Sequence, residues 1–195
     1  MTTIANPPRQ TAAGRNPGDP DPRTVVERTI RVDQAGEFGA VRIYEGQLAA
    51  LRLTGRAKGA AARKIAAMAE AERAHNREFD RLLTQRRVRP TALSPLWHVA
   101  GFALGAATAM LGEKAAMACT VAVEETIDEH YAAQAEALGD DEAELRSTIE
   151  RFRADEIEHR DTALAAGAEQ APGYEALSTV IKAGSRLAIW LSTRI

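Results

Sequence analysis

The sequence predicts an all-α fold, and three observations support it. Ala, Leu, Glu and Arg dominate a chain of 195 residues in which aromatic side chains make up only 5%, and this composition favours helices. Apolar residues recur at steps of three and four along several long segments, which is the repeat of one helix face. The alternating pattern of a β-strand is absent. We therefore expect one domain built as an antiparallel four-helix bundle with an additional C-terminal helix.

Five helical segments are expected after an N-terminal arm. Residues 1–22 contain five prolines and no apolar run, which is typical of a disordered arm. Glycine and proline breaks then divide residues 23–195. We expect helices at about 23–53 and 57–87, a long helical region over 91–138, and helices at about 140–166 and 172–195. Asp140 or Asp141 is expected to cap the fourth segment, and Pro172 to open the fifth.

The stretch 91–112 is the most apolar part of the chain. It carries no Asp, Glu, Lys or Arg over 22 residues, which is long enough for a membrane span, although its Gly, Ala, Pro95 and His98 make it weakly hydrophobic for one. A spanning helix, a helix on the membrane surface and a buried bundle helix all fit this pattern. The membrane interface is favoured by the C-terminal helix, which mixes Trp and Ile with Lys and Arg, and by a basic cluster before the stretch. That cluster consists of Arg81, Arg86, Arg87 and Arg89.

Charge and cysteine content narrow the function classes. The net charge is −2, and the basic excess of residues 1–90 has no interleaved aromatic side chains, so we expect no nucleic-acid partner. The single cysteine, Cys119, excludes an internal disulfide framework and fits a reducing compartment. No signal peptide is recognised. Arginine outnumbers lysine by 21 to 4, a usage associated with GC-rich bacterial genomes.

Two helices place a glutamate and a histidine in a face that is otherwise apolar. In the second segment this face contains Ile65, Met68, Glu72, His75, Phe79 and Leu82. In the fourth it contains Leu145, Ile149, Phe152, Glu156, His159 and Ala163. The first and third segments each add one glutamate to the corresponding face, Glu37 and Glu124. Four carboxylates and two imidazoles are therefore expected in one core.

Buried carboxylates are costly unless they are paired, protonated or bound to metal, and four facing one another cannot all ionise. No seam carries Arg or Lys at the neighbouring core positions, whereas two divalent cations would balance four glutamates. One Glu from each of two helices and Glu-x-x-His from each of two others is a ligand set already known from dimetal carboxylate bundles. Oxygen-rich ligands favour iron or manganese over copper or zinc. We expect two iron ions, because two ferrous ions can give O2 two electrons.

Beyond these residues, longer segments resemble the demethoxyubiquinone hydroxylases, a family of di-iron enzymes similar in fold to ferritin. The resemblance covers about residues 24–195. It is carried by RVDQAGEFGAVRIYEGQ, RVRPT, PLWHVAGFALGA, MACTVAVEETIDEHY, DEIEHRD and AGSRLAIWLS.

The resemblance implies a ferritin-like bundle and a function. Glu72 and Glu156 would bridge two irons, one of them completed by Glu37 and His75 and the other by Glu124 and His159. The implied reaction is O2-dependent hydroxylation of a polyprenylated methoxy-benzoquinone, preferably as the quinol, in ubiquinone biosynthesis. The family attaches peripherally to membranes, so we expect the cytoplasmic face of the bacterial inner membrane and a lipid-binding companion protein as a candidate partner.

Alternatives remain open at this stage. His130 and Tyr131, which follow Glu124, are candidates for hydrogen bonding around the ligands or for proton delivery, or they form a partly buried polar pair near a helix end. Iron storage, peroxide chemistry of the rubrerythrin or manganese catalase kind, and a non-enzymatic membrane adaptor are competing functions. The first two would share the six ligands without needing the uncharged stretch.

Overall fold

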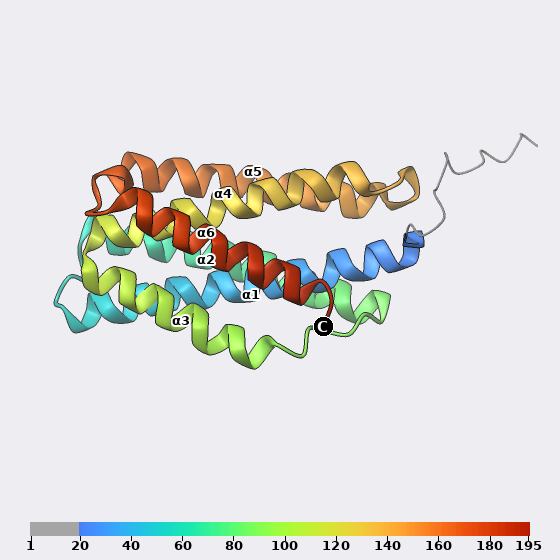
Figure 1. Ribbon diagram of the computed structural model, residues 1–195, viewed down its shortest axis with the longest axis horizontal. Coiled ribbons are helices and arrows are strands. Elements are labelled where there is room, and N and C mark those ends of the chain that lie inside the picture. The colour runs from blue at the N-terminus through green and yellow to red at the C-terminus, as the bar shows by residue number, and fades with distance from the viewer. Residues whose placement is uncertain (1–19) are drawn as a thin grey trace, which may run out of the picture.

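The computed structural model describes residues 20–195, and over this range the chain forms six α-helices and no strand (Figure 1). The all-α prediction is confirmed. Residues 1–19 of the predicted disordered arm lie outside the described range. The helices are α1 (Pro22–Leu53), α2 (Ala60–Arg86), α3 (Ser94–Leu111), α4 (Glu113–Ala137), α5 (Ala143–Ala165) and α6 (Tyr174–Ser192).

Local sequence explains where α1, α3 and α4 begin. Pro22 is the first residue of α1, and the carboxylate of Asp21 accepts a hydrogen bond of 3.0 Å from the backbone N–H of Thr24, as a helix N-cap does. The predicted long region over 91–138 is two helices, because Gly112 adopts φ 134°, a backbone conformation that side chains disfavour. Pro95 lies in the first turn of α3 and therefore opens that helix.

Two predicted helix starts are wrong. Asp140 and Asp141 do not cap α5, because a hydrogen bond from Glu142 N–H to Gly139 C=O (3.1 Å) closes a 3-10 turn over Asp140–Glu142 and α5 begins after it. Pro172 does not open α6 either. The left-handed residue Gly173 follows it, and the helix starts at Tyr174.

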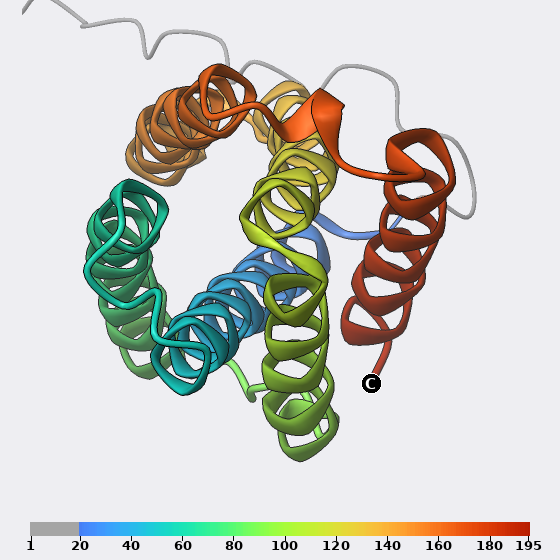
Figure 2. The ribbon, with the colours of Figure 1, turned by 90° about the vertical axis from the view of Figure 1, so that its left-hand side faces the viewer.

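The helices form a four-helix bundle with two further helices packed on one side. Viewed end-on in Figure 2, α1, α2, α5 and α4 surround a common interior, while α3 and α6 lie beyond α1 and α4. Glycine permits the close docking of α3 on α1. A Cβ on Gly105 would lie 1.9 Å from Ile43 O, and one on Gly46 would lie 2.1 Å from Phe102 O.

The outer helices α3 and α6 carry the surface that was predicted to meet a membrane. Among the described residues, no helix is both long and apolar enough to cross a bilayer. Lys182 and Arg186 of α6 form ion pairs with α4, to Glu125 at 2.5 Å and to Glu129 at 3.0 Å. The two helices nevertheless expose large apolar side chains, namely Leu96, Val99, Met110, Leu111, Val180, Leu187 and Trp190.

Candidate metal centre

The four bundle helices bring all six predicted ligand residues into one buried cluster. Helix α1 contributes one of them, α2 two, α4 one and α5 two, and each is between 0 and 8% exposed. The cluster lies between the apolar side chains that share its helix faces. The six residues are Glu37, Glu72, His75, Glu124, Glu156 and His159.

The six residues form two adjacent groups that share two carboxylates. Each group offers four ligand atoms that lie within 4.8 Å of one another. Glu72 and Glu156 belong to both groups. Glu37 and His75 complete the first group, and Glu124 and His159 complete the second. Shared carboxylates between two four-residue groups can hold two cations side by side.

Many atoms of the cluster are buried without a hydrogen-bond partner. One carboxylate oxygen of Glu37, of Glu124 and of Glu156, both oxygens of Glu72 and Nδ1 of His75 are in this state. Buried polar atoms in folded proteins are almost always bonded, so each exception needs a cause. Six atoms of the cluster that two cations could bind are thus without partners, whereas Nδ1 of His159 has a hydrogen-bond partner in Glu156. The residues therefore fit a dimetal centre.

Both histidines turn Nδ1 toward the carboxylates. Nδ1 of His75 lies 3.2 Å from Glu156 Oε1 and 3.5 Å from Glu37 Oε2. Nδ1 of His159 lies 2.9 Å from Glu72 Oε1 and 3.2 Å from Glu156 Oε2. The imidazole Nδ1 atoms are therefore the nitrogens available for a cation in this cluster.

The protonation of the metal-free cluster follows from burial and crowding. Burial, reinforced by the neighbouring Glu156, raises the pKa of Glu72 and of Glu124 well above the ordinary range. Burial opposes the charged form of His75, but the carboxylates of Glu156 and Glu37 beside it raise its pKa to about 10. Burial likewise opposes ionisation of Glu156, but the imidazoles of His159 and His75 lower its pKa to about 2. The cluster thus retains protons that cations would displace.

Two buried tyrosines hold the carboxylates that belong to only one group. The hydroxyl of Tyr131 donates to Glu37 Oε1, and that of Tyr44 donates to Glu124 Oε1 at 2.5 Å. Burial raises the pKa of both phenols, so they remain neutral donors. Tyr131 was a candidate from the sequence. Tyr44 lies seven residues after Glu37 on the same face of α1, but this spacing gives no sign of its hydrogen bond to Glu124.

The other sequence candidate, His130, lies beside the centre and makes no hydrogen bond to a ligand residue. Its Nε2 lies 2.9 Å from the amide nitrogen of Gln134, which also donates to Asp33 Oδ1 at 2.7 Å. Burial lowers the pKa of His130 to about 4, so the imidazole is neutral and can accept from the amide. Asp33, 2% exposed, was missed by the sequence reasoning. Its position one turn before Glu37 was the available signal.

A second missed residue is Asp155, whose Oδ2 lies 3.0 Å from Nε2 of His75. Because Nδ1 of His75 faces the cluster, Nε2 is the nitrogen left to donate to this carboxylate. Its position directly before Glu156 in the chain could have drawn attention to it.

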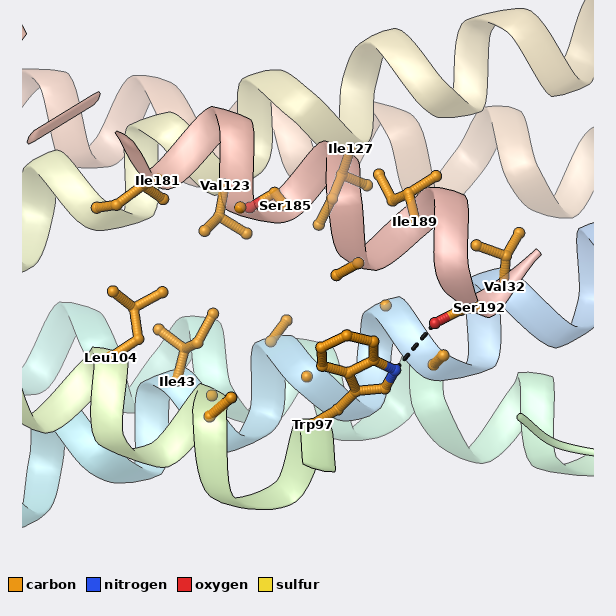
Figure 3. A pocket seen from close by; sticks show the side chains of 18 of the residues that line it. Val32, Ile43, Trp97, Leu104, Val123, Ile127, Ile181, Ser185, Ile189 and Ser192 are labelled. Atoms are coloured by element: carbon orange, nitrogen blue, oxygen red, sulfur yellow. Dashed lines mark hydrogen bonds between the residues drawn. The ribbon is translucent and has the colours of Figure 1, made fainter. Parts of the chain in front are cut away.

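An apolar groove of about 430 Å³ lies among α1, α3, α4 and α6, with α1 and α3 opposite α4 and α6. In Figure 3, Ile43 and Leu104 face Val123 and Ile181 across it, and Trp97 Nε1 donates to Ser192 Oγ at 2.9 Å. Its lining includes Gly36 and Val123, which directly precede Glu37 and Glu124 in the chain. The groove therefore lies behind the two helices that carry these carboxylates.

Known proteins resemble this chain over most of its length. A family model described as "Ubiquinone biosynthesis protein COQ7" matches residues 24–192. The chain belongs to the COQ7 family. A relative from Rhodospirillum rubrum, named 3-demethoxyubiquinol 3-hydroxylase, is 58% identical over 187 residues that cover 96% of this chain and 86% of the relative.

More distant COQ7 relatives carry related names. The human protein, an NADPH-dependent 3-demethoxyubiquinone 3-hydroxylase named as mitochondrial, is 49% identical over 177 residues, covering 89% of this chain and 79% of its own length. The Saccharomyces cerevisiae protein, a mitochondrial 5-demethoxyubiquinone hydroxylase, is 40% identical over 185 residues, covering 87% and 78%. These relatives are named as enzymes of one reaction type, and the resemblance drawn from the sequence is confirmed at the level of the family.

Proposed function

We propose that this protein is an oxygen-dependent di-iron monooxygenase that hydroxylates a polyprenylated methoxy-benzoquinone, in its quinol form, during ubiquinone biosynthesis. The observation that carries the proposal is the pair of buried four-residue groups sharing two carboxylates, in which six nitrogen and oxygen atoms lack hydrogen-bond partners. The names of the COQ7 relatives supply the substrate class.

The six residues would hold two irons between α1, α2, α4 and α5. Glu37 and His75 would bind one, Glu124 and His159 the other, and Glu72 and Glu156 both. When bound, two ferrous ions supply two electrons for the reduction of O2, which is chemistry that side chains cannot provide. The names of the human and other relatives state NADPH dependence, so we propose a nicotinamide as the ultimate electron donor.

The chain itself positions the groups around the reaction. Tyr131 and Tyr44 fix the orientation of Glu37 and Glu124 by donating to one oxygen of each, which leaves the other oxygen for metal. The groove offers an apolar space of the kind that binds a small hydrophobic ring. We propose that the quinol ring occupies the groove and approaches the centre between α1 and α4.

A membrane location would account for the exposed apolar side chains of α3 and α6, two helices that line this groove. We propose that these helices rest on the cytoplasmic face of a bacterial inner membrane, so that the prenyl tail remains in the lipid while the ring enters the protein. A lipid-binding companion protein would help to deliver so apolar a substrate. Iron storage or peroxide chemistry would use the same ligands but gives no role to the groove.

Turnover with isotopically labelled oxygen tests the proposal. The full chain is loaded anaerobically with ferrous iron and given a short-chain demethoxyubiquinone, NADPH, a reductase and 18O2. Incorporation of one 18O into the quinone, detected by mass spectrometry, is the expected result. Glu72→Gln should abolish it, because this variant should bind one iron ion or none. Metal binding without hydroxylation, but with rapid oxidation of excess iron or decomposition of peroxide, would instead identify a storage or peroxide enzyme.

A further inference from the structure

The two halves of the metal centre differ in how their histidines are held. Nε2 of His75, the ring nitrogen turned away from the cluster, lies 3.0 Å from Asp155 Oδ2. The ring of His75 also stacks on Phe152, with the centroids 4.0 Å apart. Over residues 20–195, by contrast, His159 has ion-pair and hydrogen-bond contacts only through Nδ1. One imidazole is therefore held from both sides and the other from one.

The sequence explains this difference. The two Glu-x-x-His segments lie on α2 and α5, and each histidine faces the helix of the other segment. Asp155 directly precedes Glu156 on α5 and reaches across to His75 on α2. The corresponding position on α2, directly before Glu72, is Ala71. A methyl group cannot accept a hydrogen bond from the second histidine.

We infer that Asp155 is a positioning residue that makes the two iron positions unequal, so that the Glu37–His75 position fills before the Glu124–His159 position. The inference rests on the proposed dimetal centre and concerns its order of assembly.

The physical reason is hydrogen bonding to the far side of a metal-binding imidazole. A carboxylate that accepts from Nε2–H fixes the tautomer with a free Nδ1, holds the ring plane in place and increases the basicity of the nitrogen that binds the metal. Loss of such a partner typically weakens metal binding about 10–100-fold. The terminal carboxylates do not provide a similar asymmetry, because Glu37 and Glu124 each accept from one tyrosine. Asp155 is therefore the difference in hydrogen bonding between the two histidines.

Four variants of the full chain allow a direct test. Asp155→Ala removes the acceptor, and Asp155→Asn keeps one acceptor oxygen without the charge. Ala71→Asp places a carboxylate before Glu72, where it can accept from His159. Glu150→Ala removes one negative charge from an exposed position of α5 and is the matched control. The carboxylate of Asp155 is 46% exposed, so its removal leaves no buried gap.

Metal-free protein is titrated anaerobically with ferrous iron, and calorimetry records the heat of each binding step. Mössbauer spectra are recorded separately on a sample with one equivalent of 57Fe. The unaltered protein should bind iron in two steps whose affinities differ by about 10–100-fold, with one type of iron at one equivalent. Asp155→Ala should weaken the tighter step by that factor and leave the other unchanged, and Asp155→Asn should weaken it less. Ala71→Asp should tighten the weaker step, and Glu150→Ala should change neither.

Two equal steps in the unaltered protein, or equal effects of Asp155→Ala on both steps, would overturn the inference while leaving the dimetal centre intact. Failure of the unaltered protein to bind iron at all would overturn the proposed function along with it.

Discussion

Replacing Gly39 of α1 by alanine is expected to stabilise the fold and weaken quinone binding at the same time. Gly39 lies within a helix, where glycine costs about 0.5–1 kcal/mol relative to alanine. A Cβ at this position meets no atom within 4 Å and would project into the groove that Gly39 lines. A gain of about 0.5–1 kcal/mol corresponds to an increase in Tm of about 1–4 °C for a chain of this length.

The loss of binding follows from the space that the new side chain occupies. If one methyl group displaces contact equivalent to one CH2 of the quinone, about 0.8 kcal/mol is lost and KM rises about fourfold. A leucine at position 39 that displaces about two such groups costs about 1.6 kcal/mol, or roughly 15-fold in KM. The metal ligands are untouched, so iron content should not change.

Gly46 on the same helix is the matched control, because its Cβ would lie 2.1 Å from the backbone oxygen of Phe102. Gly46→Ala should therefore lower Tm, since α3 must move away from α1, and overpacking of this kind costs about 1–3 kcal/mol. Thermal unfolding and steady-state kinetics are measured on the three variants and on the unaltered protein. A lower Tm for Gly39→Ala would refute the description of open space. A folded Gly39→Leu with an unchanged KM would refute the groove as the quinone site.

Three further predictions concern the metal centre. Glu72→Gln and Glu156→Gln should each reduce bound iron from two ions per chain to one or none, measured by elemental analysis, while the metal-free variants keep their helical circular dichroism. Tyr44→Phe should lower the unfolding free energy of the metal-free protein, measured in urea, by about 1–3 kcal/mol, because the buried Oε1 of Glu124 loses its hydrogen-bond donor. An unchanged midpoint would contradict this. The third concerns pH. Because the raised pKa of His75, about 10, exceeds its unfolded value, the stability it contributes is complete below about pH 6.5 and is lost as the pH rises toward 10. Between about pH 6.5 and 10 the unfolding free energy of the metal-free protein should therefore fall, whereas its affinity for iron should rise. If the affinity for iron fell together with the unfolding free energy, metal binding would not be accompanied by proton release.

The sequence predicted the bundle helices well wherever apolar spacing was regular. Every member of the α2 and α5 seams, from Ile65 to Leu82 and from Leu145 to Ala163, is buried, because a core face repeats at 3.6 residues regardless of its neighbours. Helix ends were less predictable. Asp140 lies in a 3-10 turn instead of capping α5. At Gly112 the positive φ divides a region whose apolar pattern is continuous in the sequence.

At the candidate site, the sequence predicted which side chains face the core but not which side chains contact one another. Periodicity indicated that Glu72 and Glu156 face the core, since a charged residue in an apolar stripe is conspicuous. It could not show that Tyr44 on one helix reaches Glu124 on another, or that Asp155 reaches His75. Such contacts depend on the distance between helices, which no single helix encodes. The groove was missed for this reason, because its walls come from four helices.

Helix α1 contributes residues to both the ligand cluster and the groove, and both contributions reduce the stability of the fold. Toward the bundle it presents Glu37, a buried carboxylate with an unpartnered oxygen. Toward the groove it presents Gly36 and Gly39, where side chains would fit but none is present. Neither feature improves the packing of the helix, and departures from good local packing concentrate where function requires them. Helix α4 has a similar relation, since Val123 lines the groove and Glu124 joins the cluster. If the quinone ring lies in the groove as proposed, substitutions at Val123, which lines the groove directly before the ligand residue Glu124, should change the rate of hydroxylation without changing iron content.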